Sequence, residues 1–242
     1  MSDNVRLNSG ERVYERVQIS THPLMGHKLT VLRDVDTEPE TFRRVLHQVS
    51  ILLAYEATCD LATQACSVTT PLAEAIGQCL TERVALVPIL RAGLGMVEGF
   101  WTLLPDAEVW HIGLYREHST LQPVQYYANV PPLENPSKET EPSTPCRIQL
   151  CLVLDPMLAT GGSAVATVDI LKKLGAPRIK FVGIVAAPEG IHALSTAHPD
   201  VDIHVAAVDE RLTPSPSEPD DPPEGYIVPG LGDAGDRQFG TS

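Results

Sequence analysis

The sequence predicts an α/β fold in which a central, mostly parallel sheet is flanked by helices. The first observation is a set of unbroken apolar runs, of which 148–155 is the clearest. The second is that stretches with apolar residues at helical spacing alternate with these runs. The third is that two of the runs end in glycine-containing turns that carry a charged side chain. Strands of a parallel sheet are covered on both faces, so they read as continuous apolar runs, and helices connect them.

The expected elements follow from these signals in order along the chain. Residues 1–20 are polar and predict an N-terminal arm. Residues 39–58 carry apolar side chains at helical spacing behind Pro39, and proline suits the first turn of a helix. A helix at 162–174 is followed by Gly175 in the position of a C-terminal cap. The other expected helices are 94–104 and 189–197, and the expected strands are 83–90, 108–115, 148–155, 178–187 and 201–208.

Two segments rich in proline and acidic residues interrupt this alternation. They are 131–147, with five prolines and three glutamates between 131 and 145, and 213–225, with five prolines and four acidic residues. Such composition does not build a core. Because the α/β pattern resumes after the first and only a short tail follows the second, neither is a domain linker. We therefore expect a single domain, 1–242, with both segments as surface inserts.

The formal net charge of −13 limits the classes of partner. Nucleic-acid binding needs a basic surface, which such a chain lacks. No apolar run approaches the roughly 20 residues that cross a bilayer, and the first residues lack the apolar core of a signal peptide. The sequence predicts a cytoplasmic protein that binds neither nucleic acid nor membrane.

The five cysteines predict reduced thiols. Their number is odd, no CxxC pair is present, and Cys151 lies inside an apolar run. Disulfides are rare in the cytosol, so we expect none here. The cysteines are Cys59, Cys66, Cys79, Cys146 and Cys151.

The most informative segment is 155–163. An apolar run ends at Asp155, and the Thr-Gly-Gly-Ser run at 160–163 follows just before a helix. Backbone N–H groups and two hydroxyls there can bind a phosphate at the positive end of a helix dipole, and Asp155 suits sugar hydroxyls. No lysine follows the glycines and no GxGxxG is present, so this is neither a Walker A loop nor a dinucleotide fingerprint. It predicts a ribose-phosphate site; the alternative is a plain turn in which Thr160 caps the helix.

Two other strand ends supply arginines. Arg91 lies in a turn whose glycines, Gly93 and Gly95, allow the backbone to approach a ligand closely. Arg116 follows the strand 108–115 and opens a polar segment that could close over phosphates as a lid. A lid would bring positive charge to a polyanion in an acidic protein. For Arg91 the alternative is an ordinary surface position.

The C-terminal stretch 225–240 combines glycines with apolar residues. Four glycines follow Val228, and Asp233 and Asp236 lie among them. The backbone polar groups of such a segment could bind a small planar base, whose edge alternates donors and acceptors. The apolar residues at 226–228, 231 and 239 argue against the alternative of a disordered tail.

Together these segments resemble the uracil phosphoribosyltransferase family. The matching motifs are ILRAGLG (89–95), LYR (114–116), LDPMLATGGSA (154–164), VAAPEGI (185–191) and YIVPGLGDAGDRQFG (226–240), with HPLMGHK (22–28) and LAYEA (53–57) nearer the N-terminus. The similarity covers roughly residues 12–242. The 155–163 loop is typical of type I phosphoribosyltransferases, and the GLGDAGDR run points to uracil.

The resemblance implies a Rossmann-like type I phosphoribosyltransferase fold with a small hood formed by the N- and C-terminal segments. It implies a step of pyrimidine salvage, in which uracil and 5-phosphoribosyl 1-diphosphate (PRPP) give UMP and diphosphate. Mg²⁺ would be carried by PRPP rather than held directly by the protein. By position in the motifs, Asp233 and Arg116 would be catalytic. PRPP would contact Arg91, Arg116, Asp155, Pro156, Met157, Leu158, Ala159, Thr160, Gly161, Gly162, Ser163 and Asp233, and uracil would contact Ile227, Gly232, Asp233 and Ala234.

The resemblance also raises the question of regulation and assembly. Some relatives are activated by GTP, for which Lys28, Arg33 and Arg43 are candidate contacts here. The N-terminal arm and the apolar helix at 39–58 predict a homodimer or homotetramer. An alternative function is a regulatory protein that binds uridine nucleotides on the same fold, such as an RNA-binding attenuator, but the acidic charge argues against it. A fragment of a bifunctional kinase is a further alternative, against which the missing P-loop argues.

Overall fold

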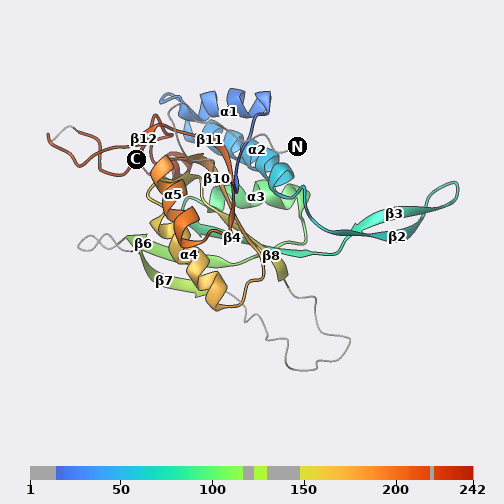
Figure 1. The fold of residues 1–242 in the computed structure, drawn as a ribbon. Helices are drawn as coiled ribbons and strands as arrows, with labels where there is room; N and C mark the ends of the chain where they lie inside the picture. The colour runs from blue at the N-terminus through green and yellow to red at the C-terminus, as the bar shows by residue number, and fades with distance from the viewer. Residues whose placement is uncertain (1–14, 117–122, 130–147, 219–220, 242) are drawn as a thin grey trace.

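A seven-strand path forms the centre of the molecule in the computed structural model, which describes residues 15–116, 123–129, 148–218 and 221–241 (Figure 1). The strand order is β1-β11-β10-β8-β4-β6-β7, and all neighbours are parallel except the β6–β7 pair. The predicted α/β class with a mostly parallel sheet is therefore confirmed. Short strands β5 and β9 pair with β4 and β10, and β12 pairs with β13 in a separate ladder.

The described helices are α1 Pro23–Arg33, α2 Pro39–Ala57, α3 Leu94–Leu103, α4 Gly162–Lys173, α5 Pro188–Ala197 and α6 Ala234–Phe239. The strands are β1 Val17–Ile19, β2 Thr63–Thr69, β3 Glu74–Leu80, β4 Arg83–Leu90, β5 Glu108–Val109, β6 His111–Arg116, β7 Pro123–Asn129, β8 Ile148–Leu154, β9 Met157–Leu158, β10 Ile179–Ala186, β11 Asp202–Val208, β12 Arg211–Leu212 and β13 Ile227–Val228. No described helix has both the length and the apolar character needed to cross a bilayer.

Two apolar cores lie on the two faces of the sheet. Helices α1, α2 and α3 pack on one face, where Phe42 and Phe100 are fully buried. Helices α4 and α5 pack on the other face (Figure 1), where Phe181 is fully buried. Because β8 and β10 are covered on both sides, nearly every residue in them is buried, which explains why these segments read as unbroken apolar runs.

The structure differs from the sequence prediction at several elements: β7, β9, β12, β13 and α6 were not predicted, and four further differences follow. The arm predicted at 1–20 contributes Val17–Ile19 to the sheet as edge strand β1, parallel to β11. Helix α1 was not predicted, and its N-terminus is capped by the side chain of His22. The strand predicted at 108–115 is divided at Trp110 into β5 and β6. The fourth difference is the β2–β3 hairpin, for which no element was predicted between 59 and 82; it projects from the body (Figure 1).

The expectation of reduced cysteines is wrong for one pair. Cys66 and Cys79 form a disulfide across the β2–β3 hairpin, with 6.0 Å between their Cα atoms. The cysteine spacing gave no sign of this pair, because the unpredicted hairpin brings residues 13 apart onto facing strands. Cys59 and Cys151 are free thiols, and burial raises the pKa of Cys151 to about 12. Cys146 lies outside the described residues.

Of the two proline-rich segments, the structure describes most of 213–225, whereas all of 131–147 lies outside the described residues. The described part of 213–225 is mostly exposed and is closed at its base by Thr213, whose hydroxyl donates to Pro223 O and accepts from Tyr226 N. Next to it, β12 and β13 form a two-stranded antiparallel ladder.

Candidate functional site

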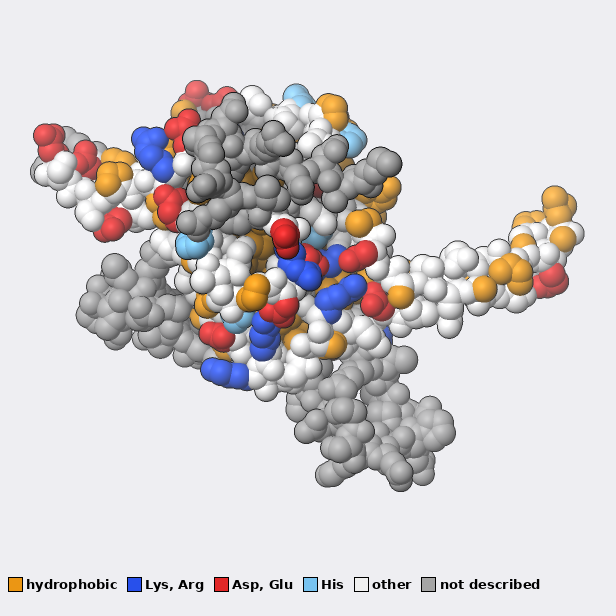
Figure 2. All heavy atoms as spheres, in the orientation of Figure 1, with side chains coloured by type: hydrophobic (Ala, Val, Ile, Leu, Met, Phe, Trp, Pro, Cys, Tyr) orange, Lys and Arg blue, Asp and Glu red, His pale blue; other side chains and the backbone are white. Residues whose placement is uncertain are grey.

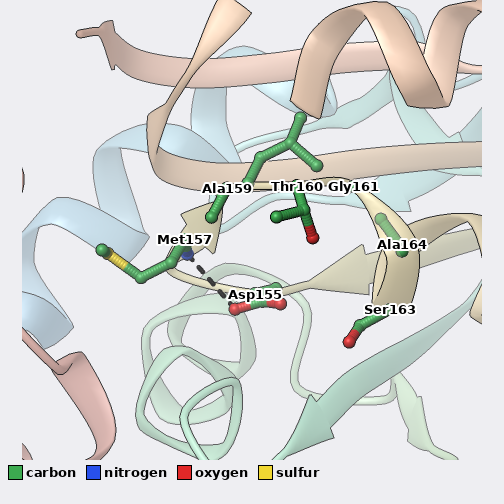
Figure 3. Close-up of a pocket in the computed structure, with 9 residues that line it drawn as sticks. Asp155, Met157, Ala159, Thr160, Gly161, Ser163 and Ala164 are labelled. Carbon is green, nitrogen blue, oxygen red and sulfur yellow. Dashed lines mark hydrogen bonds between the residues drawn. The ribbon is translucent and has the colours of Figure 1, made fainter. Parts of the chain in front are cut away.

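The 155–163 loop connects β8 to α4 and lines a pocket (Figure 3). The carboxylate of Asp155 and the hydroxyls of Thr160 and Ser163 lie around it (Figure 3). Helix α4 starts at Gly162, so its first N–H groups point toward the loop, where a phosphate would be favoured. The alternative with Thr160 as the cap fails, because the N-cap is Gly161 and no side chain caps the helix.

Asp155 sits in a poorly solvated position at the end of β8. Part of its side chain reaches the pocket, yet surrounding protein removes enough water that burial raises its pKa to about 7. A hydrogen bond from Met157 N to Oδ1, at 3.2 Å, acts in the opposite direction (Figure 3). A carboxylate with this pKa accepts hydrogen bonds from sugar hydroxyls readily, since each such bond relieves its desolvation.

Two glycines permit the shape of the 155–163 loop. Gly161 has φ +83°, a left-handed conformation that other residues adopt with strain. Gly190, at the start of α5, lies against the loop: a Cβ there would be 2.4 Å from Ala159 O and 2.5 Å from Leu158 O. The glycine of the VAAPEGI motif is therefore needed for close packing of α5 on the loop, a role that sequence reasoning missed.

The 91–95 loop lies beside the 155–163 loop. Strands β4 and β8 are parallel neighbours, with Pro88 opposite Leu154, so their carboxyl ends meet at one edge of the sheet. A Cβ at Gly93 would lie 2.2 Å from Leu154 O, so only glycine allows the two strand ends to come this close. Arg91 consequently lies at the same edge of the sheet as Asp155.

The C-terminal segment, defined here as residues 225–241, packs onto the 91–95 loop. Arg91 Nη2 donates to Asp236 Oδ1 at 3.0 Å, and Gln238 Nε2 donates to Ala92 O at 2.9 Å. A Cβ at Gly235 would lie 3.8 Å from the Cβ of Ala92. Three segments far apart in the sequence therefore meet at one place. Of these contact residues, Gln238 was not singled out from the sequence, because a lone glutamine carries no pattern.

Asp233 is the N-cap of α6. Its Oδ1 accepts a hydrogen bond from Asp236 N at 2.9 Å, which is the usual role of an aspartate at a helix start. Asp236 differs, because hydrogen bonds from Thr241 Oγ1 and then Arg91 hold its pKa below the ordinary value. The sequence-predicted Asp233 thus lies one turn of helix from the residue that pairs with Arg91.

The predicted base-binding residues belong to the same segment. Ile227 is buried in β13, and Ala234 is buried at the first turn of α6. Gly232 lies between them with φ +69°. Ile227, Gly232 and Ala234 have no polar side chains, so only their backbone groups could form hydrogen bonds with a ligand.

Arg116 ends strand β6, which pairs with β4 near its carboxyl end. Its backbone therefore belongs to the same edge of the sheet as Arg91, whereas its side chain lies outside the described part of the structure. The lid predicted to follow it begins at 117–122, which also lies outside the described residues.

The three candidate GTP contacts are engaged elsewhere in the chain. Lys28 Nζ donates to Gln48 Oε1 at 2.6 Å, and Arg43 Nη1 donates to Gln238 O at 2.7 Å. Arg33 makes a two-pronged ion pair with Asp209. In each case the positive group has a structural partner.

The acids at the site suit a metal ion that arrives with its substrate. Among the residues that the structure describes, no group of three His, Cys, Asp or Glu side chains could hold a metal ion. Asp155 and Asp233 each use Oδ1 to accept one backbone N–H, and within the described residues Oδ2 of each accepts no hydrogen bond. Mg²⁺ prefers one or two carboxylates together with waters and substrate phosphates, so this donor set fits it.

Comparisons with known proteins agree on one family. The family model described as uracil phosphoribosyltransferase matches residues 19–241. The uracil phosphoribosyltransferase of Roseiflexus castenholzii is 56% identical, covering 94% of this chain and 99% of its own length. That of Symbiobacterium thermophilum is 50% identical, covering 93% of this chain and 99% of its own. Among solved structures, the AQ2163 protein from Aquifex aeolicus is similar with a TM-score of 0.80 and 34% identity, over 93% of this chain and 99% of that one.

Proposed function

Because the chain belongs to the uracil phosphoribosyltransferase family, we propose that its three converging segments divide the two substrates between them. The family reaction is the reaction of this chain: the phosphoribosyl group of PRPP is transferred to uracil, giving UMP and diphosphate. In the proposed division, the 155–163 loop holds the ribose phosphate, Arg91 and Arg116 hold the diphosphate, and the C-terminal segment holds uracil. The observation that carries this proposal is the direct packing of α6 on the 91–95 loop.

The proposed chemistry needs no protein nucleophile. The bond from the ribose C1 to the diphosphate breaks as the bond to N1 of uracil forms, and positive charge develops on the ribose ring. N1 releases its proton in the same reaction, and the departing diphosphate or solvent accepts it. Asp155 accepts hydrogen bonds from the ribose hydroxyls and Asp233 lies toward the sugar, so both carboxylates favour that charge. Arg91 and Arg116 neutralise the departing diphosphate. Most of the rate enhancement then comes from alignment and electrostatic stabilisation.

Mg²⁺ is part of this proposal as a companion of PRPP. When bound to the diphosphate, it withdraws negative charge from the leaving group. Asp233 would face this metal, which PRPP would carry into the site. The N–H donors at the start of α4 would meanwhile fix the 5′-phosphate.

We also propose that residues 1–242 act as one domain in a homodimer or homotetramer. The β2–β3 hairpin supports the oligomer, since Leu72 is 97% exposed and Ile76 75% exposed on an arm that stands clear of the body (Figure 2). Apolar side chains gathered on such a projection favour contact with another surface. Activation by GTP has less structural support, because Lys28, Arg33 and Arg43 all have partners within the chain.

A cytoplasmic location is the last part of the proposal. PRPP and UMP are phosphorylated and do not cross membranes unaided, so the reaction belongs where they are made and used. A disulfide such as Cys66–Cys79 is uncommon in that reducing compartment.

The test is a direct assay of base specificity. Purified protein with PRPP and Mg²⁺ is given uracil, cytosine or orotate, and nucleotide products are separated by chromatography. We expect UMP from uracil and no nucleotide from the other two bases. A reaction without PRPP is the control. Folded protein that makes no UMP with metal present would remove the proposed function.

A further inference from the structure

A network of four hydrogen bonds clamps the peptide groups of Gly230, in the C-terminal segment. Arg33 Nη1 and Nη2 donate to Asp209 Oδ2 and Oδ1 at 2.8 and 2.6 Å. Arg33 Nη1 also donates to Gly230 O at 2.9 Å, and Gly230 N donates to Asp209 Oδ2 at 2.8 Å. Both backbone polar groups of Gly230 are therefore held by one ion pair.

The ion pair is shielded from water. The side chain of Asp209 is 4% exposed and that of Arg33 is 26% exposed. A buried, two-pronged arginine–carboxylate pair has a defined geometry, unlike a surface pair, whose side chains move. Gly230 itself has φ +63°, and a Cβ there would lie 2.1 Å from Ile227 O. The turn at Gly230 is thus set by glycine and then locked by Arg33 and Asp209.

A second arginine, Arg237, extends from the C-terminal segment to the end of α1. Arg237, in α6, donates to Leu231 O at 2.9 Å and to the carbonyls of Leu32 and Asp34 at the end of α1. Its guanidinium lies 4.6 Å from the centre of the Phe42 ring. Arg33 therefore reaches from α1 into the C-terminal segment, and Arg237 reaches back to α1, so that Gly230 and Leu231 are each held by an arginine.

This arrangement matters because the segment recognises its ligand with backbone groups. A side chain can rotate to orient its polar group toward a ligand, whereas the orientation of a peptide group is fixed by the conformation of the backbone. Gly230 lies between Ile227 and Gly232, two of the proposed uracil contacts. None of the atoms of Arg33 or Asp209 is needed to touch the base.

We propose that Arg33 and Asp209 are positioning residues for uracil, which act by fixing the peptide groups of Gly230. This inference rests on the proposed function of the C-terminal segment. It assigns to Arg33 a role inside the chain in place of a contact with GTP. The clamp sets the affinity for uracil and leaves the PRPP contacts that follow β4 and β8 unchanged.

The experiment compares KM for uracil with KM for PRPP in Asp209→Asn, Arg33→Met and Arg33→Lys. We expect Asp209→Asn and Arg33→Met to raise KM for uracil about 10- to 100-fold, the effect of losing hydrogen bonds to a buried charge, with KM for PRPP within about threefold of wild type. Arg33→Lys restores only part of the loss, because an ammonium group cannot form the two-pronged pair. The double variant Arg33→Met/Asp209→Asn is expected to lose less than the sum of the single variants.

The chain offers a matched control pair at the opposite end of β11. Arg16 Nη1 donates to Asp202 Oδ1 at 3.0 Å, joining the N-terminal part of the chain to β11 without touching the C-terminal segment. Arg16→Met and Asp202→Asn are expected to leave both KM values unchanged. Circular dichroism of each variant checks folding, and if Asp209→Asn does not fold, the charge-conserving Arg33→Lys decides.

Two results would overturn the inference. One is a folded clamp variant with the wild-type KM for uracil. The other is an equal rise in both KM values, which would indicate a general loss of structure. Failure of the proposed function is distinguishable, because then the wild-type protein itself makes no UMP.

Discussion

The 155–163 loop and the C-terminal segment, the two halves of the proposed binding site, are built in different ways. The loop is one continuous run between β8 and α4, and its ligand-facing groups come from residues within nine positions of each other. The C-terminal segment is held by distant partners instead: Arg33 and Asp209 at Gly230, and Arg91 and Ala92 at α6. The first is local in sequence, and the second depends on the folding of the whole chain.

The carboxyl groups of the two regions also differ, because their pKa values are shifted in opposite directions. Burial raises the pKa of Asp155 to about 7, so the loop holds a carboxyl that is only partly ionised at neutral pH. Hydrogen bonds from Thr241 and Arg91 lower the pKa of Asp236, which is ionised under the same conditions. In the 155–163 loop the carboxyl of Asp155 has no positively charged partner among the described residues, whereas in the C-terminal segment the carboxylate of Asp236 is paired with Arg91.

The largest effect is expected from Asp233→Asn, which separates the two roles of that side chain. Asparagine caps a helix as well as aspartate does, so the bond from Asp236 N is retained and the melting temperature changes little. The lost negative charge beside the ribose lowers kcat about 10²- to 10³-fold. Steady-state kinetics and thermal unfolding measure the two quantities separately.

The control for Asp233→Asn is Asp221→Asn. Asp221 also accepts backbone N–H groups, from Ser217 and Glu218, but in the 213–225 loop. We expect this variant to keep wild-type kcat. A wild-type rate for Asp233→Asn would leave Asp233 with its capping role alone.

The second prediction concerns the stability of the unliganded protein. Since the pKa of Asp155 is raised to about 7, the folded state binds more protons than the unfolded state between about pH 4 and pH 7. Its contribution to the free energy of unfolding is therefore most favourable at low pH and falls as pH rises through that window. Asp155→Asn has no carboxyl at this position and so lacks this loss of stability. The free energy of unfolding of the variant, relative to that of the wild type, should therefore increase by on the order of a few kcal/mol from pH 4 to pH 8.

Urea unfolding at several pH values measures this difference. Asp200→Asn is a control of opposite sign, because Lys172 lowers the pKa of Asp200 and the pair stabilises the fold above pH 4. Asp200 is exposed, so its effect should stay below about 1 kcal/mol. A stability difference for Asp155→Asn that does not vary with pH would contradict the assignment of a raised pKa.

The local region was predictable because its signals are contiguous. The end of β8 at Leu154, the acid, the glycines and the start of α4 at Gly162 all follow from one stretch of sequence. The β2–β3 hairpin was missed since its strands are exposed on most positions and show no apolar alternation. Helix α1 was missed as well, although it supplies Arg33.

The clamp on Gly230 was beyond the reach of sequence patterns. Arg33 and Asp209 lie 176 residues apart, and neither belongs to a motif with a known spacing. Asp209 follows β11 and Arg33 ends α1, so their meeting depends on the strand order that places β11 beside β1. The residues of the C-terminal segment could be recognised from sequence, whereas the contacts that hold the segment could not.

The smallest effect on kinetics is expected from disrupting the Arg91–Asp236 ion pair, which joins the two halves of the proposed site. Arg91 is paired with Asp236 in the unliganded chain, so diphosphate must compete with that carboxylate for the guanidinium. Asp236→Asn weakens the competitor and is expected to lower KM for PRPP about two- to threefold, a modest change because the pair is solvent-exposed. Thr241→Val is the matched control: it removes the hydroxyl that also donates to Asp236 Oδ1 and leaves Arg91 in place, so KM for PRPP should not change. If KM for PRPP rises in Asp236→Asn, Asp236 holds Arg91 ready for diphosphate, and the C-terminal segment assists PRPP binding as well as uracil binding.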